Sequence, residues 1–320
     1  MRAEPGWWAV ESARRVTKRP RRIVRFGEPW VLYREASGAV RVLHDVCPHR
    51  GASLALGRID GDHIACPFHG FQFDGNGHCR AIPAHAPDEP IPSVMRVRAL
   101  PTKVEHELVW VWWGGGEPRG EPRFFEALSR MRFGELSRVW STHYTRAIEN
   151  QLDFLHLPFV HRTTIGRRIA PRMEIVTESD ETFVRGRFAD AEAGVRVELL
   201  TPNVWTLQVG RGITQFLAFM PVDDTHTEIL CRAYHDRVRI PVVRELYELV
   251  LAWGNRVILG QDQAVVESQR PYETELGMSE RLVPGDSPIA AYRRIRHRAL
   301  KGALRVVSED EPAAREADAE

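Results

Sequence analysis

The segment CPHRGASLALGRIDGDHIACPFHG spans residues 47–70 and holds two of the four cysteines of the chain. Each cysteine is followed by a histidine, two positions later in the first half and three positions later in the second half. Sixteen residues separate the two halves, and a glycine follows each histidine within two positions. Thiolates and imidazoles at such short spacing are typical ligands of zinc or of an iron–sulfur cluster. The segment therefore predicts a metal site, with four candidate ligands: Cys47, His49, Cys66 and His69.

Zinc and a two-iron cluster are the alternatives for this ligand set. Zinc fingers usually pair cysteine with cysteine and histidine with histidine, whereas each half here contributes one of each. That arrangement suits a [2Fe–2S] cluster in which one iron takes both thiolates and the other takes both imidazoles. Gly51 and Gly70 would let backbone amides approach the cluster. Imidazole ligands raise the reduction potential of such a cluster to between about −150 and +300 mV.

The remaining composition is that of an ordinary globular protein. The chain has 320 residues, of which 43% are hydrophobic and 27% charged, and its formal net charge is +1. This length is comfortable for two hydrophobic cores. The weak net charge favours neither nucleic acid nor a membrane as a partner. No apolar stretch is long enough to cross a bilayer and the start lacks an apolar signal core, so we expect a cytoplasmic protein.

The pattern of apolar residues changes along the chain. Short runs rich in Val, Ile and aromatic residues predict strands over residues 21–113 and again over residues 172–238. Helical spacing predicts helices over residues 123–135 and 146–161, one long helix or two over residues 242–269, and another over residues 287–304. Residues 114–122 are the candidate linker, and the acidic tail is expected to be disordered.

The cysteine–histidine segment resembles the Rieske iron–sulfur motif, Cys-x-His, sixteen residues, then Cys-x-x-His, with CPHRGA and CPFHGFQFD as flanks. The cytochrome-complex branch of that family has two further cysteines that bridge the loops, and Ala52 and Phe68 hold their places here. The similarity is therefore to the oxygenase and ferredoxin branch. Cys79 and Cys231 lie outside the pattern and are expected to be buried as small apolar side chains.

A second group of candidate ligands lies in the segment ENQLDFLHLPFVH, residues 149–161. Asp153 and His156 are three residues apart, which places them on one face of a helix. His156 and His161 are five apart and would diverge on an ideal helix, so we expect Pro158 to bend the chain and let both imidazoles converge. Two histidines and one carboxylate are the ligand set of non-heme iron(II) oxygenases.

This segment is similar to the mononuclear-iron motif of Rieske oxygenases, Asp-x-x-His-x-x-x-x-His, and Glu149 is the candidate for the leading acid of the fuller pattern. In that family the third iron ligand is an aspartate far downstream on a long helix, and ILGQDQAVVESQRP resembles that region. Asp262 stands at the matching place, and Glu267 is the competing acid. The resemblance thus implies iron(II) held by His156, His161 and Asp262.

The resemblance covers nearly the whole chain and implies an α+β protein with two domains. Residues 1–115 would form an all-β Rieske [2Fe–2S] domain. Residues 116–307 would form a catalytic domain of the helix-grip type, an antiparallel sheet with helices, which holds the mononuclear iron. Residues 308–320 would form the disordered acidic tail.

The resemblance also implies a homotrimer in which the cluster of one subunit lies near the iron of the next. Asp153 would then accept hydrogen bonds from His69 of one subunit and His156 of the other. An NAD(P)H-dependent reductase, a ferredoxin or both would supply electrons. The expected reaction with O₂ is hydroxylation or demethylation of a small, partly apolar organic molecule. The alternatives are ring cis-dihydroxylation, an electron carrier without oxygenase activity, and a zinc-stabilised scaffold.

Overall fold

The structure is a computed structural model of the chain, and it describes all residues except 87, 168, 191–194, 210–211, 237–240 and 311–320. The chain forms two compact units. The first unit comprises Met1, Trp7–Trp113 and Pro118–Pro122, and the second comprises Arg2–Gly6, Gly114–Glu117 and the chain from Arg123 onward. The chain passes between the units within residues 114–122, the candidate linker, and also near its start, within residues 1–7.

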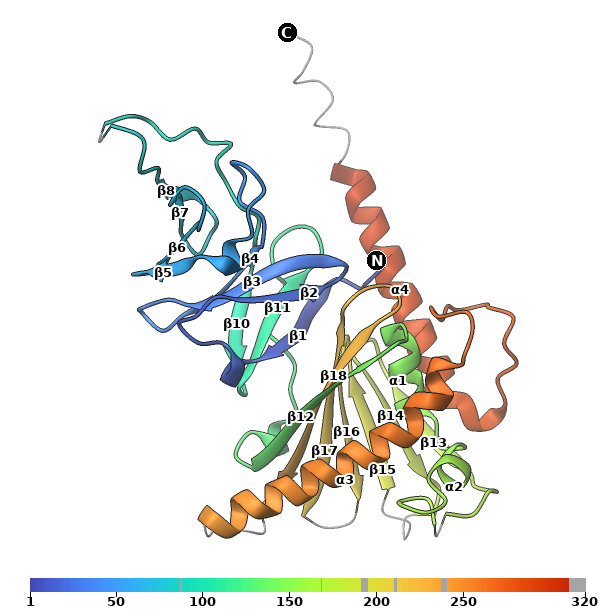
Figure 1. Ribbon diagram of the computed structural model, residues 1–320. Coiled ribbons are helices and arrows are strands. Elements are labelled where there is room, and N and C mark those ends of the chain that lie inside the picture. Colours follow the sequence, from blue (N-terminus) through green and yellow to red (C-terminus); the bar gives the residue numbers. More distant parts are fainter. Residues whose placement is uncertain (87, 168, 191–194, 210–211, 237–240, 311–320) are drawn as a thin grey trace. The chain divides into compact units, whose positions relative to one another are not determined.

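The first unit consists of strands and short 3₁₀ turns (Figure 1). Its three sheets have the strand orders β1–β11–β10, β2–β3–β4–β9 and β5–β6–β7–β8. The strands are β1 (Gly6–Ser12), β2 (Arg21–Arg25), β3 (Glu28–Arg34), β4 (Val40–His44), β5 (Arg58–Asp60), β6 (His63–Ala65), β7 (Gln72–Phe73), β8 (Cys79–Ala81), β9 (Ala99–Leu100), β10 (Thr102–Glu105) and β11 (Leu108–Trp113). Strand β11 is buried at every residue except its last, as its unbroken apolar sequence predicts.

One hydrophobic core supports the two cysteine loops of this unit. It includes both candidate cysteine ligands and side chains from strands β3, β4, β6 and β7. The members are Val31, Tyr33, Leu43, Cys47, Leu54, Ile64, Cys66, Phe71, Phe73, Cys79, Ile82 and Val97. Cys79 and, in the second unit, Cys231 are both buried, as expected for small apolar side chains.

The second unit is built on a seven-stranded sheet with the order β12–β18–β17–β16–β15–β14–β13, in which all neighbouring strands are antiparallel (Figure 1). The strands are β12 (Arg132–Trp140), β13 (Ile175–Ser179), β14 (Phe183–Phe188), β15 (Val195–Leu200), β16 (Val204–Val209), β17 (Ile213–Pro221) and β18 (Thr227–His235). The helices are α1 (Tyr144–Leu152), α2 (Leu157–Val160), α3 (Pro241–Glu267) and α4 (Ser287–Asp310).

The helices of this unit pack on the sheet and on one another. Helix α3 runs across the sheet and packs on β12 and β18, whereas α4 packs on β13 and β14 (Figure 1). Helix α1 contacts both α3 and α4 as well as β15 and β17. An all-β unit followed by an antiparallel sheet with helices confirms the predicted fold class. None of the helices within the described residues is both long and apolar enough for a bilayer crossing.

Two details of the predicted elements are wrong, and both concern residues 123–161. The helix expected over residues 123–135 is instead a 3₁₀ turn at Glu126–Leu128 followed by strand β12. Pairing with β18 overrides the helical spacing, because Phe133 pairs with Tyr234 and Glu135 accepts a hydrogen bond from Arg232 at 2.9 Å.

The second detail is the position of the break near Pro158. Helix α1 ends at Leu152, and the next residue, Asp153, has extended backbone angles (φ −81°, ψ 126°). Helix α2 then begins at Leu157, so Pro158 lies in its first turn, where a missing amide hydrogen costs no helical hydrogen bond. Pro158 therefore helps to start a new helix, and the turn between the helices carries His156. The last predicted element, the acidic tail, lies mostly outside the described residues, and α4 continues to Asp310.

A buried ion network joins α1 to α4. Arg293 donates two hydrogen bonds to Glu149, from Nε to Oε1 at 2.8 Å and from Nη2 to Oε2 at 2.7 Å. Arg293 also donates to Glu280 at 2.6 Å, and Thr274 donates to Glu149 at 2.6 Å. Burial disfavours the charged form of Arg293, yet its hydrogen bonds to Glu149 and Glu280 raise its pKa. This network orients the helix that precedes Asp153.

We expect Arg293→Ala to lower the free energy of unfolding by about 3–5 kcal/mol, because it leaves the buried Glu149 carboxylate without its cation. Arg294→Ala is the matched control on the same helix, since Arg294 is exposed and its removal is expected to change stability by about 0.5 kcal/mol or less. Urea unfolding of the two variants measures the difference. Equal midpoints for the two variants would mean that the network contributes little.

Candidate active site

The two cysteine loops of the first unit share one backbone pattern. In each loop the cysteine amide donates to the carbonyl five residues later, and the cysteine carbonyl accepts from the amide four residues later, at 2.8–3.0 Å. These loops begin at Cys47 and Cys66, and each thiol-bearing residue is only 2% exposed. The two loops therefore place their cysteines in equivalent turns, and both cysteines are buried.

Gly51 and Gly70 close the two loops in the left-handed region, with φ of 73° and 75°. A side chain would be strained at either position, although a Cβ on Gly51 would have no atom within 4 Å. The positive φ angle is thus one reason for glycine at both positions.

The two histidines of these loops are exposed, in contrast to the cysteines. The imidazole centroids of His49 and His69 lie 4.6 Å apart, and His49 stacks on Phe71 with a centroid distance of 4.7 Å. Phe68 is 56% exposed, and its ring lies 4.0 Å from that of His69. Buried thiols beside exposed imidazoles suit a cluster with one inner and one outer iron.

The chemistry of the cysteines also fits a metal cluster. Burial, together with the neighbouring Cys66 thiol, raises the pKa of Cys47 to about 11. A metal ligand must be a thiolate, so a thiolate here needs a strong positive partner. Iron ions would supply that charge, and the four side chains present therefore fit the group.

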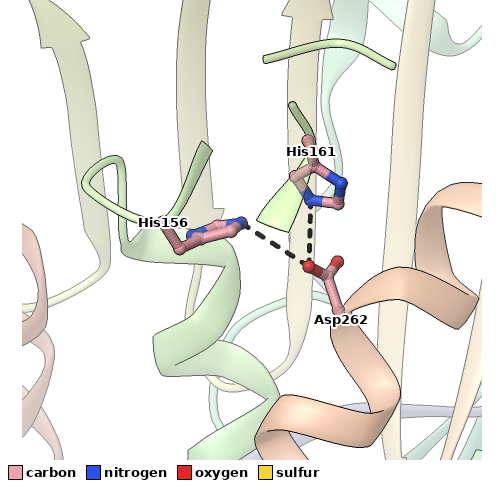
Figure 2. A group of neighbouring side chains, drawn as sticks. All are labelled: His156, His161 and Asp262. Atoms are coloured by element: carbon pink, nitrogen blue, oxygen red, sulfur yellow. Dashed lines mark ion pairs between the residues drawn. The ribbon is translucent and has the colours of Figure 1, made fainter. Parts of the chain in front are cut away.

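The second unit brings together the three residues predicted as ligands of a single iron. His156, His161 and Asp262 each offer an atom within 4.8 Å of the others (Figure 2). His156 comes from the turn before α2, His161 from the end of α2, and Asp262 from the last third of α3. The Nε2 atoms of His156 and His161 lie 3.6 Å and 2.9 Å from the same carboxylate oxygen, Oδ1 of Asp262.

That carboxylate oxygen requires a positive charge beside it. Asp262 is 2% exposed, and its Oδ1 has no hydrogen-bond partner among the described residues. His161 donates its Nδ1 hydrogen to Gln261 Oε1 at 2.8 Å, so a neutral His161 presents a lone pair from Nε2 to Oδ1. Burial lowers the pKa of His161, but the Asp262 charge and the Gln261 contact outweigh it and raise the pKa. A proton or a metal cation must therefore lie between the two atoms, and the donor set is that of a divalent transition metal.

Two glutamines that the sequence did not identify surround this group. Gln261 is held by Thr164, whose hydroxyl donates to its Oε1 at 2.8 Å, and it fixes the tautomer of His161. Gln151 donates to Oδ2 of Asp262 at 3.4 Å. The only sequence signal for Gln261 is its position next to Asp262.

Asp153 lies at the edge of the group and is partly exposed. Its Oδ1 accepts the amide hydrogen of Leu155 at 2.7 Å. Its Oδ2 lies 3.5 Å from Nδ1 of His156, and this nitrogen has no hydrogen-bond partner among the described residues. Asp153 thus lies beside His156 without a hydrogen bond between the two side chains.

The other two candidate acids lie away from the group. Glu149 is buried in the ion network with Arg293 and does not line the site. Glu267 accepts the amide hydrogen of Ser141 at 2.7 Å, one and a half turns beyond Asp262 on α3. Of the two acids weighed for the third ligand, Asp262 is the one that the fold brings to the histidines.

The three side chains open onto a cavity with about 50 Å³ of room for the centres of water-sized molecules. One wall is the sheet, where β15 and β16 each contribute two apolar residues and β17 contributes Gln215. The other walls come from α1, α2 and the loop after it, and from α3. The lining residues are Asn150, Gln151, Asp153, Phe154, His156, Leu157, His161, Ile165, Ile169, Val195, Val197, Trp205, Leu207, Gln215, Ile258 and Asp262.

Comparison with protein families supports both halves of this description. Residues 6–102 match the Rieske [2Fe-2S] domain, and residues 140–202 match the vanillate O-demethylase oxygenase C-terminal domain. The first match contains both cysteine loops. The second contains the segment with Asp153, His156 and His161.

Curated relatives match different lengths of the chain. An iron–sulfur subunit of the toluene-4-sulfonate monooxygenase system of Comamonas testosteroni is 35% identical over 48% of this chain and 45% of its own length. A vanillate O-demethylase oxygenase subunit of a Pseudomonas species is 29% identical over 61% of this chain and 57% of its own length. Chlorophyllide a oxygenase of Chlamydomonas reinhardtii is 27% identical over 85% of this chain and 44% of its own length. The chain spans about half the length of the curated relatives that it matches.

Solved structures show the same fold. The NdmA protein of Pseudomonas putida CBB5, in a mutant form with theobromine, superposes with a TM-score of 0.77 at 24% identity, over 93% of this chain and 94% of that one. Dicamba monooxygenase bound to dicamba superposes with a TM-score of 0.73 at 20% identity, over 95% and 98% of the two chains. The two domain matches and the curated relatives thus show that this chain joins a Rieske [2Fe-2S] domain to a C-terminal domain of the vanillate O-demethylase oxygenase type, and that it is similar to Rieske oxygenases.

Proposed function

We propose that this protein is the terminal component of an oxygenase system that uses O₂ to hydroxylate or demethylate a small, partly apolar organic molecule. We expect an aromatic or cyclic substrate. The observation that carries the proposal is the group of His156, His161 and Asp262 on the wall of an apolar cavity. A protein that only carried electrons through its first unit would need neither the three ligands nor the cavity.

The two metal groups of the family have suitable ligands in this chain. The cluster would take its four ligands from Cys47, His49, Cys66 and His69. The mononuclear iron would take its three ligands from His156, His161 and Asp262. When bound, the cluster supplies single electrons and the mononuclear iron supplies the chemistry that activates O₂.

The surrounding side chains hold the proposed iron ligands in an orientation and tautomer that suit a metal. Gln261 accepts the Nδ1 hydrogen of His161, which leaves Nε2 unprotonated for a metal. Gln151 holds the second oxygen of Asp262 and so limits rotation of that carboxylate. Apolar side chains such as Val197 and Leu207 keep water away from the reacting atoms.

We further propose that Asp153 connects the cluster of one copy to the iron site of another. Its carboxylate is 3.5 Å from Nδ1 of His156 and partly exposed, so it can accept a second hydrogen bond from outside the unit. The proposed second donor is the exposed His69 of a neighbouring copy in a homotrimer. An NAD(P)H-dependent reductase, alone or through a ferredoxin, is the proposed electron donor.

Exposed apolar side chains support an assembly of several copies. Phe68 is exposed beside His69, and Phe159 is exposed between His156 and His161 in sequence. The outer face of α3 is also apolar, with Trp253 69% exposed. Exposed residues of this kind are enriched at surfaces that bind other proteins.

The matched C-terminal domain favours hydroxylation or demethylation over ring cis-dihydroxylation. Residues 140–202 match the domain of vanillate O-demethylase, and this part of the chain supplies two of the three proposed iron ligands. The toluene-4-sulfonate relative carries monooxygenase in its name. A relative named 3-chlorobenzoate-3,4-dioxygenase covers a smaller share of this chain, 44%.

A product screen tests the proposed reaction. The iron-loaded protein, a reductase and NADH are incubated with aromatic and methylated compounds, and mass spectrometry follows gain of oxygen or loss of a methyl group. We expect such a product from the wild type and from Glu267→Ala, but not from Asp262→Ala. Product from Asp262→Ala at the wild-type rate would contradict the assignment of the third ligand.

Substitution of Asp153 tests the connection between sites. Asp153→Asn retains the size of the side chain but accepts weaker hydrogen bonds, so both metal sites should remain filled. After rapid mixing of the reduced protein with O₂ and a substrate from the screen, we expect cluster oxidation to slow by at least about 10-fold. Asp88→Asn, which removes an exposed charge in the first unit, is the control. Near-normal oxidation in Asp153→Asn would exclude the proposed role.

A further inference from the structure

The walls of the cavity are mostly apolar and are set by strand register. Val197 pairs with Leu207 across β15 and β16, and Leu207 pairs with Gln215 on β17. In the next row Trp205 lies between Leu199 and Leu217. Because alternate residues of a strand point to opposite faces, Val197, Trp205, Leu207 and Gln215 all line the cavity. A molecule bound here would contact mainly hydrocarbon and indole surface.

The cavity offers no positive charge to an anionic ligand among the residues that the structure describes. Its ionisable lining residues are the three proposed iron ligands, His156, His161 and Asp262, and the neighbouring Asp153, so two of the four are carboxylates. The described lining includes neither lysine nor arginine. A carboxylate or sulfonate in this cavity would lose its hydration and find no lysine or arginine, and the two carboxylates of the lining, Asp153 and Asp262, would offset the charge of a bound iron(II) ion, which disfavours binding of an anion.

One buried donor on the wall has no partner. Trp205 is 1% exposed, and its indole N–H makes no hydrogen bond within the described part of the chain. The amide of Gln215 is occupied, since its Nε2 donates to Oδ1 of Asn255 at 3.2 Å. Asn150 Nδ2 is a second unpaired donor, but Asn150 is less buried. Trp112 and Trp140 also have buried, unpaired N–H groups, but of these three tryptophans only Trp205 lines the cavity. Because most buried donors in folded proteins are paired, we expect the indole N–H of Trp205 to receive an acceptor from a molecule in the cavity.

We propose that this cavity selects an uncharged, mainly apolar aromatic or cyclic molecule that places one hydrogen-bond acceptor against the indole N–H of Trp205. The acceptor is a carbonyl oxygen or a ring nitrogen, each of which accepts a hydrogen bond more strongly than an aryl ether oxygen does. This inference rests on the proposed function, because it takes the cavity beside the iron ligands as the substrate site. It makes Trp205 a specificity-determining residue.

Three aromatic probes of similar shape test the proposal by calorimetry on the iron-loaded, oxidised protein under argon. These are 4-methoxyacetophenone, with a neutral carbonyl; 4-ethylanisole, without that carbonyl; and 4-methoxybenzoate, an anion at neutral pH. We expect the ketone to bind about 3- to 10-fold more tightly than 4-ethylanisole. We expect it to bind at least about 10-fold more tightly than the benzoate.

Two tryptophan variants separate the role of the indole N–H from a loss of packing. Trp205→Phe should bind the ketone and 4-ethylanisole equally. Trp140→Phe should retain the preference for the ketone, because Trp140 also has a buried, unpaired N–H but does not line the cavity. Should Trp205→Phe fold poorly, the order of the three probes on the wild type still decides the proposal.

The proposal is overturned if the benzoate binds as tightly as the ketone, if none of the three probes binds, or if Trp205→Phe retains the preference for the ketone. None of these binding measurements needs turnover. A failure to form product would therefore count against the proposed function, whereas a preference for the anion would count against this inference alone.

Discussion

The candidate site of the second unit depends on one buried carboxylate oxygen, Oδ1 of Asp262, which must be paired with a positive charge. Two imidazole nitrogens face this oxygen, and no hydrogen bond from the described residues compensates it. An isolated buried charge is costly, so the site is stable only with a proton or a cation between these atoms. Three separate segments bring His156, His161 and Asp262 together. The ion pair of Glu149 and Arg293 orients α1, the helix that precedes His156.

The first unit holds its candidate metal ligands on two loops of similar structure. Two loops with the same backbone hydrogen bonds each place one buried thiol at their start. The histidine follows two positions later in one loop and three positions later in the other, and the two rings nevertheless lie 4.6 Å apart. Two similar turns can therefore present an asymmetric ligand set, with sulfur inside and imidazole at the surface. This asymmetry suits a cluster that must exchange electrons with a partner.

The amount of structure that the sequence predicts depends on how local the determining interactions are. The cysteine loops were predictable because spacing, proline and glycine act within a few residues. Asp262 was predictable only through the resemblance, since nothing near it in the sequence indicates that α3 returns to His156 and His161. The helix predicted over residues 123–135 was wrong because its apolar spacing contains no information about β18, the strand with which Phe133 pairs. Trp205 and Gln215 could not be assigned to the cavity, because the face of a strand depends on its register.

The central claim is that one chain holds iron in two chemically different places. Iron and acid-labile sulfide analysis of the purified, reconstituted protein tests it most directly. The account predicts three irons and two sulfides per chain, and a reddish protein that becomes paramagnetic when the cluster is reduced. Two irons per chain would indicate an electron carrier without the mononuclear site. A colourless protein that contains zinc and no sulfide would contradict the account as a whole.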